Sequence, residues 1–154
     1  MNPNQEYNGA LLVADDERDV RELVEFIGAQ SGFDKESIIG ASTGNEAYEK
    51  FLELQTPSAV IALDMRMPNG NGRDFIQKLI DNEHFTPEAL GQKNIQIMLM
   101  SATPDYMLQI QEEFVDTGII PEGVILGKVS KPFNTGEVLV HLEKRKTKEM
   151  ASVA

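Results

Sequence analysis

The sequence contains no cysteine, which excludes disulfide bridges, thiolate catalysis and cysteine-ligated zinc. Histidine is almost absent as well: His84 and His141 lie far apart in the chain, so a histidine-rich metal site is not expected. No apolar run approaches the roughly 20 residues that a membrane-spanning helix needs. The first residues also lack the basic start and apolar run of a signal peptide, so we expect a cytoplasmic protein without membrane partners.

Positive charge is scarce too. The chain has 14 Lys and Arg against 25 Asp and Glu, a formal net charge of -11. Nucleic-acid backbones are neutralised by Lys and Arg, so this balance argues against direct DNA binding. The 154 residues suit one domain with a full hydrophobic core, and a composition that is 41% hydrophobic and 25% charged is that of an ordinary globular protein.

Five short apolar runs recur along the chain, and each is followed by a segment whose apolar residues have helical spacing. Strands without polar alternation, separated by helices, are typical of a parallel sheet buried on both faces. The pattern therefore predicts an α/β three-layer sandwich with a five-stranded parallel sheet and five helices. The predicted strands are 10–14, 37–41, 59–63, 95–100 and 123–127; the helical stripes are 20–27, 47–54, 75–80, 107–115 and 138–142.

The expected organisation is an N-terminal extension over 1–9, one domain over 10–142 and a basic tail over 143–154. In that tail, cations favour the C-terminal end of the last helix, so we interpret them as its solvated end. They are Lys144, Arg145, Lys146 and Lys148.

Chemically reactive residues follow four of the strands. Asp15 and Asp16 follow the first, Asp64 the third, Ser101 the fourth, and Lys131 comes shortly after the fifth. In open parallel sheets the carboxyl ends of the strands form the ligand crevice, so these groups are expected to converge on one edge.

Each of these residues alone suits a helix cap, a turn acid or an exposed cation. A like-charged cluster at adjacent strand ends is not explained that way, because three close carboxylates repel unless a cation or shared proton intervenes. Mg²⁺ prefers oxygen ligands such as carboxylates and phosphate oxygens. An acidic Mg²⁺ site beside a lysine suits phosphoryl transfer, with one carboxylate as the nucleophile.

These motifs resemble the receiver domains of two-component response regulators, over about residues 11–142. The matching segments are Asp15-Asp16 after Leu-Leu-Val-Ala, Asp64 followed by Met-Arg-Met-Pro and Gly72, Ser101-Ala102, and Lys131-Pro132-Phe133. The resemblance implies a flavodoxin-like strand order of 2-1-3-4-5.

The resemblance also implies a role for each residue. Asp64 would accept the phosphoryl group, and Mg²⁺ would be bound by Asp16 and Asp64, by Asp15 largely through water, and by the backbone carbonyl of Arg66. Ser101 would hydrogen-bond the phosphoryl group, and Lys131, held before a cis peptide bond to Pro132, would pair with it. The phosphodonor would be a histidine kinase or a histidine phosphotransfer protein, and the chain would act as an enzyme only on its own Asp64.

Three positions are expected to tune the switch. Lys128 stands where the family usually has an aromatic residue that turns inward on activation; we expect this lysine to stay at the surface, on a face that binds an unknown downstream protein. Arg66 and Thr103 lie two residues after Asp64 and Ser101, where they would influence how water reaches the phosphoryl group.

Three other functions fit these residues less well. A pseudo-receiver, which has this fold but needs no phosphorylation, usually loses an acid or the lysine, whereas this chain keeps all five positions. A haloacid-dehalogenase-type phosphatase needs a second acid two residues after its nucleophile, where this chain has Arg66. A flavin-binding protein of the same fold would need a phosphate-cradling loop after the first strand, and the sequence shows no such loop there. No DNA-binding or catalytic domain follows, so we expect the protein to signal through its own surface or within a relay.

Overall fold

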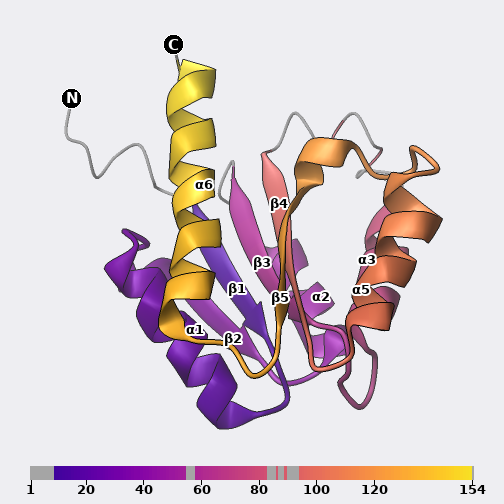
Figure 1. Cartoon of the computed structure of the whole chain (residues 1–154), viewed down its shortest axis with the longest axis horizontal. Helices are drawn as coiled ribbons and strands as arrows, with labels where there is room; N and C mark the ends of the chain where they lie inside the picture. Colours follow the sequence, from indigo (N-terminus) through magenta and orange to yellow (C-terminus); the bar gives the residue numbers. More distant parts are fainter. Residues whose placement is uncertain (1–8, 55–57, 83–85, 87–88, 90–93, 154) are drawn as a thin grey trace.

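The computed structural model describes residues 9–153 except 55–57, 83–85, 87–88 and 90–93, and side chains only as far as residue 145. Nearly all of the expected N-terminal extension lies outside the described residues. Five parallel strands form one sheet in the order β2-β1-β3-β4-β5, which confirms the predicted fold class and strand order (Figure 1). The strands are β1 Ala10–Ala14, β2 Ile38–Ala41, β3 Ala59–Asp64, β4 Ile95–Ser101 and β5 Ile125–Ser130.

Helices cover both faces of the sheet (Figure 1). On one face lie α1 Arg18–Gln30 and α6 Thr135–Val153, and on the other α2 Gly44–Glu53, α3 Gly72–Asp81 and α5 Pro104–Ile110. A π-helical turn, η3 Gln111–Val115, continues α5, and short 3₁₀ turns, η2 Lys35–Ser37 and η4 Glu122–Val124, precede β2 and β5. Within the described part of the chain, none of these helices has the length and apolarity needed to cross a membrane.

The central strands are buried on both faces because successive side chains point to opposite sides of the sheet. In β1, Leu11 and Val13 pack in the core under α1 and α6, while Leu12 and Ala14 pack in the core under α2, α3 and α5. Fully burying one Leu or Val side chain stabilises the fold by about 1.5–3 kcal/mol. The strand ends that carry the candidate site are therefore held by a core on each side.

Hydrogen bonds at the helix starts fix the loops at this edge of the sheet. The Thr43 hydroxyl accepts a bond from the Glu46 N–H at 3.0 Å, so Thr43 is the N-cap of α2. The first N–H of α2, on Gly44, donates to the Gly70 carbonyl at 2.7 Å and so ties α2 to the loop that follows β3. A side chain at Gly44 would overlap the Gly70 carbonyl, which explains the glycine there.

Four strand predictions were wrong at a boundary. Two of them, β3 and β4, are each one residue longer than predicted and end at Asp64 and Ser101. Ser37 belongs to η2 rather than to β2, and β5 runs from Ile125 to Ser130 rather than over 123–127. The predicted limits followed the apolar residues, but β5 is an edge strand, and its Lys128 and Ser130 are exposed. Polar residues are therefore tolerated there, and the apolar run marks only the first part of the strand.

The prediction for the last helix and the tail that follows it was also wrong in part. Its apolar stripe holds at Val138 and Leu142, but Leu139 is 36% exposed. Arg145, expected at a solvated helix end, is buried, with its guanidinium carbon 3.8 Å from the centre of the Phe33 ring. A planar guanidinium stacks well on an aromatic face, so this cation packs against the domain.

Candidate functional site

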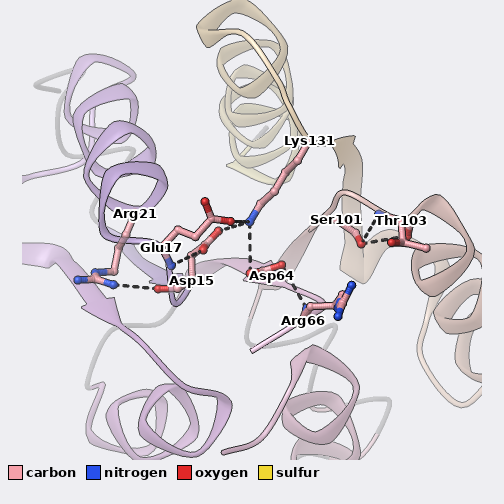
Figure 2. A network of polar contacts seen from close by, with 8 residues as sticks. All are labelled: Asp15, Glu17, Arg21, Asp64, Arg66, Ser101, Thr103 and Lys131. Carbon is pink, nitrogen blue, oxygen red and sulfur yellow. Dashed lines mark hydrogen bonds and ion pairs between the residues drawn. The ribbon is translucent and has the colours of Figure 1, made fainter. Parts of the chain in front are cut away.

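The four sequence-predicted strand ends meet at one edge of the sheet (Figure 2). Asp64 is the last residue of β3 and Ser101 the last of β4, whereas Asp15 directly follows β1 and Lys131 directly follows β5. Figure 2 shows Asp15, Asp64 and Lys131 pointing toward one another from these separate elements. The Lys131-Pro132 peptide bond is cis, as the family resemblance implied.

The Lys131 ammonium joins the carboxylates of the site. Its Nζ lies 2.6 Å from Asp15 Oδ2, 3.2 Å from Asp64 Oδ2 and 3.7 Å from Glu17 Oε1. Lys131 is 11% exposed, Asp15 is fully buried and Glu17 is 65% exposed. The two short contacts are therefore shielded from water and salt, while the contact to Glu17 is largely screened.

Asp15 is held through all of its polar groups. Its N–H donates to the Ala41 carbonyl at 3.0 Å, and its own carbonyl accepts from Arg21 Nη1 at 2.9 Å. Its Oδ1 accepts from the Glu17 N–H at 2.9 Å, and its Oδ2 from Lys131. Neither Glu17 nor Arg21 was singled out in the sequence. Glu17 extends the Asp-Asp pair and so gave some signal, whereas one arginine on a helix gave none.

The surroundings of the Asp64 carboxyl raise its pKa. Burial raises the pKa of Asp64 from its ordinary 3.8 to about 6, and the nearby charge of Asp15 acts in the same direction. The Lys131 ammonium and the Arg66 N–H, which donates to Asp64 Oδ1 at 3.2 Å, lower the pKa by less than this. The lowering by Lys131 and Arg66 therefore does not offset the combined effect of burial and Asp15 on this carboxyl.

At Lys131 the neighbouring charges together have a larger effect on the pKa than burial does. Burial lowers the pKa of Lys131, but the hydrogen bond and charge of Asp15, together with Asp64, outweigh that effect and leave the pKa raised. Lys131 is therefore a cation at all physiological pH values, fixed beside both acids.

The acidic residues suit a divalent cation. Asp15, Asp16 and Glu17 each offer an oxygen, and these oxygens lie within 4.8 Å of one another. Asp16 and Glu17 are exposed, so the cluster is open to solvent beside buried Asp64. Carboxylate oxygens are the ligands that Mg²⁺ prefers, and an ion bound here would favour the charged form of Asp64, which burial and the charge of Asp15 disfavour.

Ser101 is buried, and its hydroxyl is engaged away from Asp64. Its Oγ donates to the Thr103 carbonyl at 2.9 Å and accepts from the Thr103 N–H at 3.0 Å (Figure 2). The predicted pair Ser101 and Thr103 thus forms a local turn at the start of α5. To donate to a group on Asp64, the hydroxyl would have to give up its bond to the Thr103 carbonyl.

Arg66 is exposed and lies at the rim of a cavity of about 640 Å³. Asp64 and Lys131 line one end of this cavity, and Arg73 and Tyr106 line the part that extends toward α3 and α5. In Figure 2 the Arg66 side chain points away from Asp15. The structure thus brings Arg66 to the site through its backbone N–H and to the cavity through its guanidinium.

Lys128 is not part of this cluster. It is exposed on β5, and its Nζ donates to Gln111 Oε1 at 3.1 Å, across to the turn that continues α5. The position where the family usually has an aromatic ring therefore carries a solvated cation on the face formed by α5, β5 and α6.

The chain is similar in sequence to one curated protein, the chemotaxis protein CheY1 of Helicobacter pylori (strain ATCC 700392 / 26695). The two are 32% identical over 75 residues, which is 49% of this chain and 58% of that protein. The match thus spans little more than half of the relative's length. No family model matches the chain.

Solved structures resemble the chain over nearly its whole length. A CheY-like response regulator receiver domain protein from Methanospirillum hungatei JF-1 has 26% identity, covers 93% of this chain and 95% of its own, and has a TM-score of 0.62. The chemotaxis response regulator CheY4 of Vibrio cholerae has 19% identity, coverages of 90% and 98%, and a TM-score of 0.64. A receiver domain protein from Clostridium thermocellum has 19% identity, coverages of 94% and 98%, and a TM-score of 0.66. The latter two likenesses show the fold alone.

Proposed function

Because this chain is a CheY-like response-regulator receiver domain, we propose that it accepts a phosphoryl group on Asp64 in a Mg²⁺-dependent reaction and signals through protein contacts. The donor is a phosphohistidine of a histidine kinase or of a histidine phosphotransfer protein, or a small acyl phosphate. The observation that carries this proposal is the position of Lys131 Nζ, 2.6 Å from Asp15 and 3.2 Å from Asp64, next to an open acidic cluster.

Each site residue has its own role in this phosphoryl transfer. An Asp64 oxygen forms the new bond to phosphorus while the bond from phosphorus to the donor nitrogen or oxygen breaks, and the leaving group keeps that electron pair. Asp15, Asp16, Asp64 and the main-chain oxygen of Arg66 would hold Mg²⁺, which supplies charge stabilisation on the phosphoryl oxygens. Lys131, already positioned between the acids, pairs with the phosphoryl group.

Ser101 provides the link to a conformational change. Its single hydroxyl hydrogen is donated to the Thr103 carbonyl, and that bond has to break before the hydroxyl can donate to a phosphoryl oxygen. The start of α5 then loses a local restraint. We infer that this part of the molecule changes on phosphorylation, and that the face carrying Lys128 presents the change to a downstream protein.

The direct test is intact-mass measurement with acetyl phosphate. With Mg²⁺ we expect one phosphoryl adduct that is lost under conditions that hydrolyse acyl phosphates, and none in Asp64→Asn or with a chelator. Asp34→Asn is the control, because Asp34 is exposed and precedes β2, at the opposite end of the sheet. An adduct of the same size in Asp64→Asn would refute the assignment, and no adduct in the wild type would favour the pseudo-receiver.

A second prediction concerns Arg66. Its guanidinium lines the cavity that leads to Asp64, where it can contact a phosphoryl oxygen or obstruct attacking water. We therefore expect phospho-Asp64 to decay several-fold faster in Arg66→Asn than in the wild type at fixed Mg²⁺. Radiolabel loss over time measures this rate.

Arg73→Asn is the matched control for Arg66. Arg73 lines the same cavity but is engaged by Glu113 at 2.8 Å. Equal decay of phospho-Asp64 in the wild type and in Arg66→Asn would show that Arg66 does not protect the phosphoryl group.

A further inference from the structure

Arg21 reaches the acidic site from an element that carries none of the predicted site residues. It lies on α1, and its Nη1 donates to the main-chain oxygen of Asp15 at 2.9 Å (Figure 2). The guanidinium is half-buried and permanently charged, so this is a charge-assisted bond of the stronger kind. The predicted site residues do not include it, yet it bonds the backbone between the two adjacent aspartates.

A glycine in β2, Gly40, leaves space for the Arg21 side chain. Gly40 pairs with Val13 in the sheet, and a Cβ at Gly40 would lie 3.1 Å from Arg21 Cδ and would overlap the Glu25 carboxylate. The absence of a side chain at Gly40 therefore lets the stem of Arg21 lie along the strand. The same stem carries the guanidinium to the end of β1.

The bond to Asp15 constrains Asp16 through the peptide group. A peptide unit is planar, so the Asp15 carbonyl and the Asp16 N–H turn together. The Asp15 N–H and side chain are already held by Ala41, Glu17 and Lys131. Arg21 holds the one remaining polar group of Asp15, its main-chain carbonyl. This bond fixes the plane of the peptide group that joins Asp15 to Asp16.

Asp16 depends on such a restraint because it is exposed, so its direction follows from its main chain. Its charge is repelled by Asp15 and Glu17, whose oxygens lie within 4.8 Å of its own. We propose that Arg21 is a positioning residue, which orients the Asp16 carboxylate toward bound Mg²⁺ by holding the main-chain oxygen of Asp15. This inference rests on the proposed Mg²⁺ site.

The positive charge of Arg21 by itself would have the opposite effect. A cation beside the acidic cluster repels Mg²⁺, so an Arg21 that acted only through its charge would weaken metal binding. Removing both the charge and the hydrogen bond of Arg21 should therefore lower Mg²⁺ affinity if Arg21 positions Asp16. It should raise Mg²⁺ affinity if Arg21 acts only through its charge.

The test is Mg²⁺ titration by isothermal calorimetry of unphosphorylated variants. Arg21→Met should lower Mg²⁺ affinity about tenfold, the loss typical of a partner that orients a metal ligand. Arg21→Lys, which keeps the charge and one donor on a slightly shorter stem, should recover part of that loss. If Arg21→Met does not fold, Arg21→Gln replaces it, because the glutamine amide is too short to reach the carbonyl.

Lys50→Met is the matched control. Lys50 Nζ donates to the Gly40 carbonyl at 2.6 Å, which is also a charge-assisted bond to a main-chain oxygen, but on the neighbouring strand β2 and not to an aspartate. It should lower stability without changing Mg²⁺ affinity. Unchanged or tighter binding in Arg21→Met, or an equal loss in Lys50→Met, would overturn the proposal, whereas a wild type that binds no Mg²⁺ would refute the proposed function instead.

Discussion

Mg²⁺ affinity is expected to fall in Asp16→Ala by more than the roughly 10- to 100-fold that loss of an outer-shell partner costs. Asp16 is one of the two exposed members of the acidic cluster, with Glu17, so it can face an ion in solvent. In Lys131→Ala the affinity should be retained or should increase, because an ammonium 2.6 Å from Asp15 and 3.2 Å from Asp64 is removed from the site. Calorimetric Mg²⁺ titration of both variants measures the difference.

Phosphorylation separates the same two variants in a second way. Lys131→Ala should still form the adduct on Asp64 but should lose the conformational response, which limited proteolysis or amide exchange in α5 would report. Equal loss of Mg²⁺ affinity in Asp16→Ala and Lys131→Ala would mean that the metal-binding and phosphoryl-reading roles are wrongly divided.

Asp64→Asn should stabilise the metal-free protein at neutral pH by about 3 kcal/mol. The pKa of Asp64 is raised from 3.8 to about 6, and each pKa unit corresponds to about 1.4 kcal/mol of stability. The folded state thus prefers the neutral acid, so the stability that Asp64 contributes is fully present below about pH 4 and is lost as the pH rises through about 6. Asparagine stays neutral throughout, and the advantage of the variant should grow over that range and then level off.

Urea unfolding in a chelator, at a series of pH values from about 4 to 8, measures this difference. Asp34→Asn, which neutralises an exposed acid at the far end of the sheet, should show no comparable trend. Added Mg²⁺ should stabilise the wild type, by about 2.7 kcal/mol at 100 times its dissociation constant, and should leave Asp64→Asn nearly unchanged. A variant that is less stable than the wild type at neutral pH would contradict the assigned burial of negative charge.

The fold was predictable because local patterns carry most of it. Apolar runs such as Leu11–Val13 mark strands that are buried on both faces, and the four-residue spacing of Val20 and Val24 marks a helix packed on one side. Where burial is one-sided, this signal fails. The polar second half of β5, at Lys128 and Ser130, was missed because an edge strand exposes part of its surface.

The membership of the site was also readable from the chain, because parallel strands deliver their carboxyl ends to one edge. That rule places Asp15, Asp64, Ser101 and Lys131 together but says nothing about which atoms pair. The pairing of Lys131 with Asp15, across 116 residues, and the engagement of Ser101 by Thr103 depend on side-chain directions that only the packed structure defines.

The amino-acid sequence by itself determined the strand and helix periodicities and the residue types at each strand end, since these follow from short-range chemistry along the chain. Tertiary structure alone decided that Arg145 leaves solvent to stack on Phe33, and that Arg21 reaches back to the Asp15 main chain. Both arginines carry long, flexible side chains whose partners lie on other elements or loops. Their positions are chosen by the space and hydrogen-bond acceptors that folding brings near them, and no local pattern encodes that choice.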